Sequence, residues 1–455
     1  MLDFVNITTK ANKNGVLEAT PSFKVIKSKD LMIRGNAFYS IWDETEQSWT
    51  TDEFEAIHLI DKMTMDYCSK EMVGATPQLL VNADNCLIDK WKKYCQKQAI
   101  NNYKQLDETL IFSNMESKRE NYSSKSLSYP LIRGDHSAWD RLLSVLYTEE
   151  ERHKIEWAIG AIVSGDSKWI QKFMVFYGSA GTGKSTVLNI IQMLFDGYYA
   201  VFDAKALGGN NNSFALEAFR SNPLVAIQHD GDLSRIEDNT KLNSLVSHEE
   251  MTVNEKFKSS YTSSFKAFLM MGTNKPVKIT DAKSGLIRRL IDVTPTGNKI
   301  PADEYHEIMG QIPFQLSGIA HHCLDVYLDD PKYYNDYVPE GMIEATNDFY
   351  NFVADSYVTF MEAKDVPLTL AWEMYKNYCE DSKVPHVKSK RQFKDELKNY
   401  FTEFRDRHTL EDGKRVRSYY IGFIENNFNG HKEEKEKPEP KKKTLVFISF
   451  QFYSY

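Results

Sequence analysis

Apolar residues in the middle of the chain occur either in short runs or at helical spacing. The run Phe173–Tyr177 predicts a buried strand, and the five apolar residues at 187, 188, 190, 191 and 194 lie on one face of a helix. Two later runs, 224–227 and 265–274, predict further strands. This succession of strands and helices predicts an α/β fold that continues to about Pro295.

The pattern changes on the N-terminal side of this part. Residues 1–135 combine a hairpin-like stretch with helical stretches and contain a Ser-rich segment, 113–128, which is typical of a linker or an exposed loop. Thr148 followed three residues later by Glu151 has the form of a capping box and predicts the start of a helix. We therefore expect a mixed N-terminal domain over 1–135 and an α/β domain over 136–345.

A second change comes near residue 346. Two predicted helices, the later one starting at Ser389, precede alternating segments with Asp412-Gly413 at their turn, which is typical of a β-hairpin. Helix, helix and hairpin in this order predict a winged-helix domain over 346–428. Residues 429–455 contain a charge run, which predicts a disordered tail.

Composition narrows the class of protein. The 455 residues are 42% hydrophobic and 26% charged, as in ordinary soluble globular proteins. No apolar run reaches the length that spans a bilayer, and the first residues contain no apolar signal core, so we expect a cytoplasmic protein without a membrane partner. The five cysteines are scattered and form no C-x-x-C pair, which argues against a disulfide framework and a cysteine zinc site. The net charge of −8 excludes a wholly basic surface but permits a local basic groove.

The segment after the first strand matches the pattern G-x-x-x-x-G-K-[ST] of phosphate-binding loops. Its glycines let backbone N–H groups approach phosphate oxygens, and the following helix adds the positive end of its dipole. Lys184 can reach the terminal phosphates and the Ser185 hydroxyl can bind Mg²⁺. The strand before the loop and the helix after it predict a site for ATP and Mg²⁺. The predicted nucleotide-binding residues are Gly178, Ser179, Ala180, Gly181, Thr182, Gly183, Lys184, Ser185 and Thr186.

Polar residues follow the next two predicted strands. Asp230 and Asp232 end the second, where one carboxylate can hold Mg²⁺ and another can orient the attacking water. Asn274 ends the third and could position that water. Arg288 and Arg289 follow, and an arginine offered to a neighbouring subunit can stabilise the charge on the transferred phosphoryl group.

A basic cluster lies between the second and third strands. Lys256, Phe257 and Lys258 fall at the predicted tip of a hairpin, where lysines can contact DNA phosphates and the ring can stack on a base.

In this order the loop, the acidic strand end, the basic hairpin, Asn274 and the arginine pair resemble superfamily 3 helicases. The similarity is closest to the branch found in phage, plasmid and poxvirus primase-helicases, and it extends from about Trp139 to residue 300. The residues ahead of it are too few for the usual primase domain, so we expect the helicase portion without primase activity. The resemblance implies a P-loop NTPase with an AAA+-like superfamily 3 core.

The resemblance also implies a homohexameric ring that hydrolyses ATP between subunits and moves 3′→5′ on single-stranded or forked DNA, with a separate primase or other replication proteins as partners. It places the catalytic roles on Lys184, Asn274 and an arginine finger, with Arg289 preferred over Arg288, and assigns Lys256–Lys258 to DNA. In the family the acidic strand usually ends in adjacent carboxylates, whereas here His229 precedes Asp230 and Asp232 comes two residues later. The roles of the two carboxylates therefore stay open.

Two alternatives belong to other classes. An origin-binding initiator would use ATP as an assembly switch and the winged helix to bind duplex DNA; residues 383–417, which include Lys390 and Arg391, carry eleven basic and six acidic residues. A metabolic phosphotransferase would need neither the basic hairpin nor the arginine pair. The leading prediction is a replicative DNA helicase of a phage or other mobile element.

Overall fold

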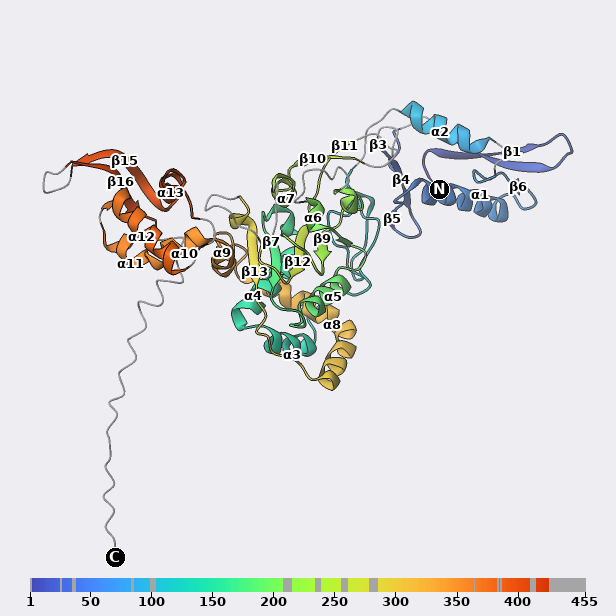
Figure 1. Ribbon diagram of the computed structural model, residues 1–455. Helices are drawn as coiled ribbons and strands as arrows, with labels where there is room; N and C mark the ends of the chain where they lie inside the picture. Colours follow the sequence, from blue (N-terminus) through green and yellow to red (C-terminus); the bar gives the residue numbers. More distant parts are fainter. Residues whose placement is uncertain are drawn as a thin grey trace, which may run out of the picture. The chain divides into compact units, whose positions relative to one another are not determined.

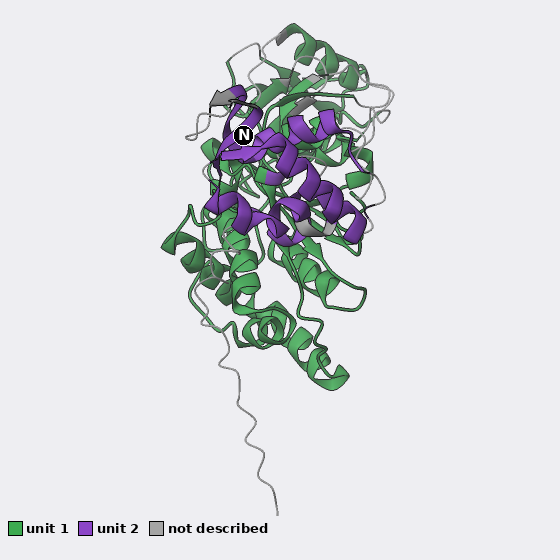
Figure 2. Ribbon diagram, turned by 60° about the vertical axis from the view of Figure 1, so that its left-hand side comes forward, with its two compact units in different colours: residues 1–278, 288–337 green, residues 279–287, 338–455 purple. Residues whose placement is uncertain are grey.

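The structure is a computed structural model of the chain. It describes residues 2–24, 27–34, 38–82, 86–98, 104–207, 215–233, 239–254, 261–277, 285–363, 365–382, 384, 387–409 and 415–424. The chain divides into two compact units, residues 1–278 with 288–337 and residues 279–287 with 338–455 (Figure 2). Each unit is described by itself.

The first unit begins with two small sheets and two helices (Figure 1). Strands β1, β2 and β6 form one sheet and β3, β4 and β5 form the other, in which β4 and β5 are the predicted hairpin. The Asp52 side chain accepts a hydrogen bond from the Glu55 amide and caps α1. The bounds are β1 (Val5–Ala11), β2 (Leu17–Phe23), β3 (Leu31–Arg34), β4 (Phe38–Asp43), β5 (Ser48–Trp49), α1 (Glu53–Lys70), β6 (Thr76–Pro77) and α2 (Leu87–Gln98).

The segment from 104 to 135 follows without long elements, and its Ser-rich part, 113–128, is largely exposed as composition predicted, with only Ser123 and Leu127 buried. Phe112 and Leu127 are buried in the same hydrophobic core as the strands of the α/β part. The Tyr129 hydroxyl donates to the Leu194 carbonyl over 2.7 Å, and the Ile111 amide donates to the Tyr198 hydroxyl. Leu127, within the Ser-rich segment, and apolar residues beside it contact the α/β part, while most of the segment stays exposed as predicted.

Five strands form the central sheet in the order β13-β7-β12-β9-β8, and all neighbouring pairs are parallel. Apolar residues on both faces are buried, as expected for a parallel sheet covered on both sides. This sheet confirms the α/β class, and β7 has the bounds predicted for the first strand. The bounds are β7 (Phe173–Tyr177), β8 (Tyr199–Val201), β9 (Val225–Gln228), β12 (Phe268–Thr273) and β13 (Leu290–Val293).

Helices α3, α4, α5 and α8 share one hydrophobic core with this sheet. Helices α4 and α8 pack closely, since a Cβ on Gly160 would lie only 2.0 Å from the Cys323 carbonyl oxygen. The bounds are α3 (Ser137–Leu146), α4 (Glu149–Ser164), α5 (Lys184–Leu194), α6 (Ala204–Leu207), α7 (Thr240–Val246) and α8 (Ala302–Asp329).

The predicted capping box at the start of α4 is only half formed. The Thr148 hydroxyl accepts a hydrogen bond from the Glu151 amide, as predicted. The Glu151 carboxylate does not return to the cap but accepts from Lys154 Nζ and from the Thr294 amide. A lysine ammonium and a second backbone amide together bind a carboxylate more strongly than the amide of the cap residue alone. The tertiary contacts of Glu151 therefore replace the second half of the capping box.

Strands β10 (Glu250–Val253) and β11 (Tyr261–Ser264) form the antiparallel hairpin expected between β9 and β12. Its tip, with Lys256, Phe257 and Lys258, lies outside the described residues.

The second unit contains five helices and a three-stranded antiparallel sheet of order β14-β16-β15 among its described residues. Ser389 begins α13, as predicted, and the structure shows that it forms a complete capping box with Gln392. Aromatic residues form its interior, with Phe349, Phe352, Tyr375 and Phe393 in mutual ring contact. The bounds are α9 (Glu340–Thr346), α10 (Asp348–Asp355), α11 (Tyr357–Glu362), β14 (Asp365–Pro367), α12 (Leu368–Asp381), α13 (Lys390–Leu397), β15 (Phe401–Thr409) and β16 (Arg415–Phe423).

The order of helix, helix and hairpin in the second unit agrees with the prediction, while the Asp412-Gly413 turn and the charged tail lie outside the described residues. In the part of the chain that the structure describes, no helix combines the length and apolarity needed to cross a bilayer.

Candidate functional site

The glycine-rich loop joins β7 to the first residue of α5. Gly181 and Gly183 have φ of +77° and +86°, in the left-handed region that favours glycine. A Cβ on Gly183 would also lie 2.5 Å from a methyl carbon of Leu146 at the end of α3. The Gly178 amide donates to the Thr273 carbonyl, which ties the start of the loop to β12. The loop thus exposes the N-terminus of α5 beside the carboxyl end of the sheet.

Lys184 is buried at the base of this loop. Its Nζ donates to the carbonyl oxygens of Gly178 and Ser179, over 2.7 and 2.8 Å, and to Asn274 Oδ1 over 2.9 Å. Burial lowers the pKa of Lys184, and the nearby Asp230 carboxylate opposes this shift. The lysine, the loop and the end of β12 therefore form one hydrogen-bonded group.

A cavity of about 480 Å³ opens over this group. Sequence analysis did not find the part of its lining that lies beyond the motifs, because Leu146, the segment 298–300 and Tyr305 are distant in sequence and match no motif. Thr186 Oγ1 lies 3.4 Å from the Tyr305 hydroxyl, so α8 closes one side. The lining residues are Leu146, Ala180, Gly181, Thr182, Gly183, Lys184, Ser185, Thr186, His229, Asp230, Asn274, Asn298, Lys299, Ile300 and Tyr305.

The structure separates the two candidate carboxylates. Asp230 lines the cavity, whereas Asp232 is absent from its lining and forms an ion pair with Lys275, at 2.8 Å between Oδ2 and Nζ. The backbones of β9 and β12 approach closely here, because a Cβ on Gly272 would lie 2.5 Å from the His229 carbonyl oxygen. This approach places Asp230 and Asn274 at the same edge of the sheet.

The two arginines differ in their surroundings. Arg288 is exposed, while Arg289 is buried and donates from Nε and Nη2 to the Ser247 hydroxyl, over 3.0 and 2.6 Å. Burial, and secondarily the charge of Arg288, lowers the pKa of Arg289. Neither arginine is among the described residues that line the cavity of their own chain.

The predicted DNA-binding residues lie elsewhere. Lys390 and Arg391 are exposed in the first turn of α13 in the second unit. In the first unit only the two strands of the basic hairpin are described, so the role of its tip stays a prediction.

Comparisons with known proteins identify two segments of the chain. Residues 344–429 match the family described as Poxvirus D5 protein-like. The second unit is similar to poxvirus D5 proteins. This similarity agrees with the expected poxvirus branch. Residues 176–289, which hold the loop, Asp230, Asn274 and the arginine pair, match a family of unknown function, DUF5906.

Among solved structures, the apo structure of the NrS-1 C-terminal region matches with 11% identity and a TM-score of 0.49, over 86% of this chain and 96% of that chain. The A form of the apo NrS-1 C-terminal region matches with 11% identity and a TM-score of 0.48, over 84% and 93%. A comparison with curated proteins finds no match.

Proposed function

We propose that this chain is an ATP-driven replicative DNA helicase of a phage or other mobile element, acting as a hexameric ring on single-stranded DNA. The observation that carries the proposal is the meeting of Lys184, Asp230 and Asn274 at one cavity, from the ends of three adjacent parallel strands. The similarity of residues 344–429 to poxvirus D5 proteins supports a role in viral replication.

The cavity offers the groups that a nucleoside triphosphate needs. The exposed N-terminal amides of α5 favour phosphate oxygens, and Lys184 would exchange its loop carbonyl partners for the terminal phosphates. The Ser185 hydroxyl and the Asp230 carboxylate would hold Mg²⁺, which neutralises charge on the phosphates when bound. Asn274, already bonded to Lys184, would orient the attacking water. Asp232 lies outside the cavity and would influence the site only through its ion pair with Lys275, which follows Asn274 directly.

An arginine from a neighbouring subunit would complete the site. Since Arg288 and Arg289 do not line their own cavity, either would have to serve a second copy of the chain. The exposed Arg288 needs no rearrangement to do so, whereas Arg289 would first have to leave Ser247. Ser247 directly follows α7 and precedes β10, so the arginine pair is linked to the base of the basic hairpin.

The test is ATP hydrolysis by the full chain with and without single-stranded DNA. Lys184→Ala is expected to lower kcat by about a hundredfold or more, while the exposed Lys205→Ala, in the same domain, serves as a matched control. Lys258→Ala is expected to lose the stimulation by DNA. Full hydrolysis by a monomer that is indifferent to DNA contradicts the proposal.

A second candidate function is origin binding by the second unit. The observation that favours it is the exposed pair Lys390 and Arg391 at the start of a capped helix in a helix-helix-hairpin order. In the full chain, the double variant Lys390→Ala/Arg391→Ala should then lose duplex DNA binding and retain stimulation by single-stranded DNA. Equal loss of both would favour the helicase role alone.

A further inference from the structure

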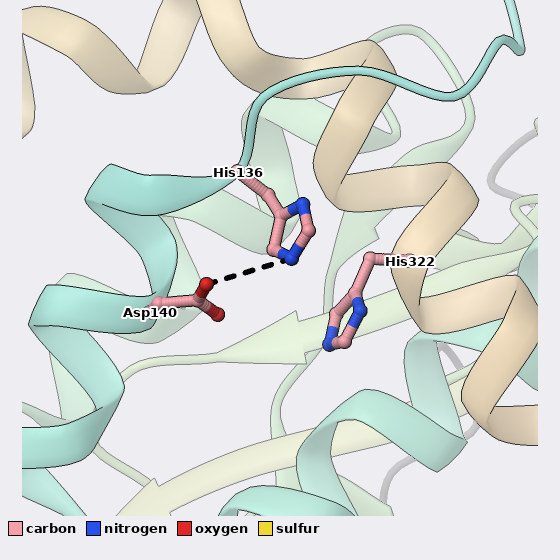
Figure 3. A group of neighbouring side chains, drawn as sticks. All are labelled: His136, Asp140 and His322. Carbon is pink, nitrogen blue, oxygen red and sulfur yellow. Dashed lines mark ion pairs between the residues drawn. The ribbon is translucent and has the colours of Figure 1, made fainter.

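Three side chains with metal-binding groups meet where α3 packs on α8. They are His136, Asp140 and His322, and Figure 3 shows them directed toward one another. One ligand atom from each lies within 4.8 Å of the others, and all three residues are half-buried. None of them lines the nucleotide cavity. The proposed function does not use this cluster.

The first two members are held in place by the helix start. His136 is the N-cap residue of α3, and Asp140, four residues later, lies on the same helical face, with 3.5 Å between His136 Nε2 and Asp140 Oδ2. His136 Nδ1 lies 3.3 Å from the Gly134 carbonyl oxygen. Donation of the Nδ1 proton to that carbonyl leaves the Nε2 lone pair facing Asp140. Metal-binding histidines are commonly oriented by such a carbonyl.

The third member stacks on the first and lies beside Glu156. The His322 ring stacks on the His136 ring, with 4.4 Å between centroids. Its Nε2 is shielded from solvent and lies 3.2 Å from Glu156 Oε1, yet makes no hydrogen bond of acceptable geometry in the described structure. That carboxylate oxygen already accepts from Trp139 Nε1 and Arg152 Nε, over 3.0 and 2.8 Å. Because Glu156 has these two other donors, it stays hydrogen-bonded when His322 Nε2 turns to a metal ion instead.

The charges around the cluster favour a cation. Asp140 and Glu156 contribute two carboxylates, and Arg152, which is bonded to both, contributes one positive charge. With neutral imidazoles, the group carries one net negative charge. Arg152 engages Asp140 Oδ1, which leaves Oδ2 on the side of His136. The arginine thereby orients the carboxylate without occupying its second oxygen.

We propose that His136, Asp140 and His322 bind a divalent transition-metal ion such as Zn²⁺. Two imidazoles and one carboxylate suit zinc or cobalt, whereas Mg²⁺ prefers an all-oxygen set. A water molecule would complete a tetrahedral site. The ion would fasten α3 to α8, two helices that also contribute Leu146 and Tyr305 to the nucleotide cavity.

The experiment uses the full chain, freed of metal with a chelator and titrated with Zn²⁺ against a chromophoric competitor. We expect one equivalent to bind and to raise the melting temperature. His136→Gln and His322→Gln should each weaken binding at least about a hundredfold. His321→Gln is the matched control, because His321, the residue next to His322 on α8, pairs with Asp325 instead, at 3.2 Å between Nδ1 and Oδ2.

Co²⁺ absorption identifies the ligands. A nitrogen and oxygen site gives d–d bands without thiolate charge transfer, and these bands should disappear in His136→Gln. Circular dichroism checks that each variant folds. We expect His136→Gln to disturb folding least, because His136 lies at the start of its helix. No stoichiometric binding, equal binding by all variants, or a thiolate spectrum from the exposed Cys86 each overturns the proposal.

Discussion

The Lys184 ammonium donates a hydrogen bond to the Asn274 side-chain oxygen over 2.9 Å, across 90 residues of sequence. This bond joins the glycine-rich loop to the end of β12, the strand that lies between β7 and β9. Two residues that sequence analysis assigned to different tasks are therefore joined by one hydrogen bond. A movement of the lysine toward a bound phosphate would stretch or break its bond to Asn274.

The first prediction concerns Asn274. Asn274→Ala removes the amide that would orient the attacking water, so kcat for ATP hydrolysis should fall about a hundredfold. Nucleotide affinity should change far less, because the loop amides remain. Hydrolysis rates and titration with a fluorescent ATP analogue measure the two effects. Asn335→Ala, at an exposed position, is the control, and an unchanged kcat in Asn274→Ala would remove this residue from the site.

The second prediction separates the two arginines. Arg288→Ala should abolish hydrolysis while leaving the melting temperature nearly unchanged, since its side chain is exposed. Arg289→Ala should lower stability by about 1–3 kcal/mol, because the buried Ser247 contact is lost. Mixing Arg288→Ala with Lys184→Ala subunits should restore part of the activity, as each completes a site for the other.

Ser247→Ala provides the control for that experiment, because it removes the acceptor and keeps both guanidinium groups. If Arg289 is the finger, Ser247→Ala should retain hydrolysis and Arg289→Ala should be the variant that recovers on mixing. Absence of recovery in every mixture of well-assembled subunits would contradict a shared site.

The third prediction concerns the packing of α4 on α8. In Gly160→Ala the new Cβ would lie 2.0 Å from the Cys323 carbonyl oxygen and 2.6 Å from Tyr327 Cβ. The helices must separate, at a cost of about 1–3 kcal/mol. Gly310→Ala, on exposed α8 surface with no atom within 4 Å, should instead stabilise by up to about 1 kcal/mol. Melting temperatures that shift in the same direction for both variants would count against this packing.

The fourth prediction is a pH dependence. Lys172 is buried before β7, where its Nζ donates to the Tyr337 carbonyl, and burial lowers its pKa from 10.5 to about 8. Between about pH 8 and 10.5 the unfolded chain holds a proton that the folded chain has released, so this group makes stability rise with pH. Burial of the charge therefore destabilises the fold most below pH 8.

Lys172→Met should consequently raise the free energy of unfolding at pH 7 by an amount on the order of 2 kcal/mol, seen as a higher melting temperature, and the gain should shrink toward pH 10. Lys205→Met, at an exposed position, should show neither effect. A gain that is equal at pH 7 and pH 10 would mean that the Lys172 charge is not what burial penalises.

Local features of the fold were predictable because they depend on neighbours in sequence. The strand Phe173–Tyr177, the helix directly after the loop and the helix that begins at Ser389 all appear where the sequence predicted them. The hairpin after β9 and the one near the C-terminal end were also predicted in type and order. Short-range backbone preferences and a hydrophobic period suffice for these elements.

Much of the candidate site was also predictable from local sequence. The loop motif identified Lys184 and Ser185, and strand ends identified Asp230 and Asn274, all of which line one cavity. The sequence could not choose between Asp230 and Asp232, since either can end a strand; the structure places Asp230, and not Asp232, in the lining of the cavity.

The sequence by itself determined the chemistry of the loop, the polar residues at the strand ends and the α/β class. Only the tertiary structure decided that the Glu151 carboxylate binds Lys154 and not the helix cap, that Leu127 of the Ser-rich segment is buried in the core, and that His136 meets His322. Each of these is a competition among partners distant in the chain. Its outcome depends on burial and charge at the meeting point, which no local pattern of residues contains.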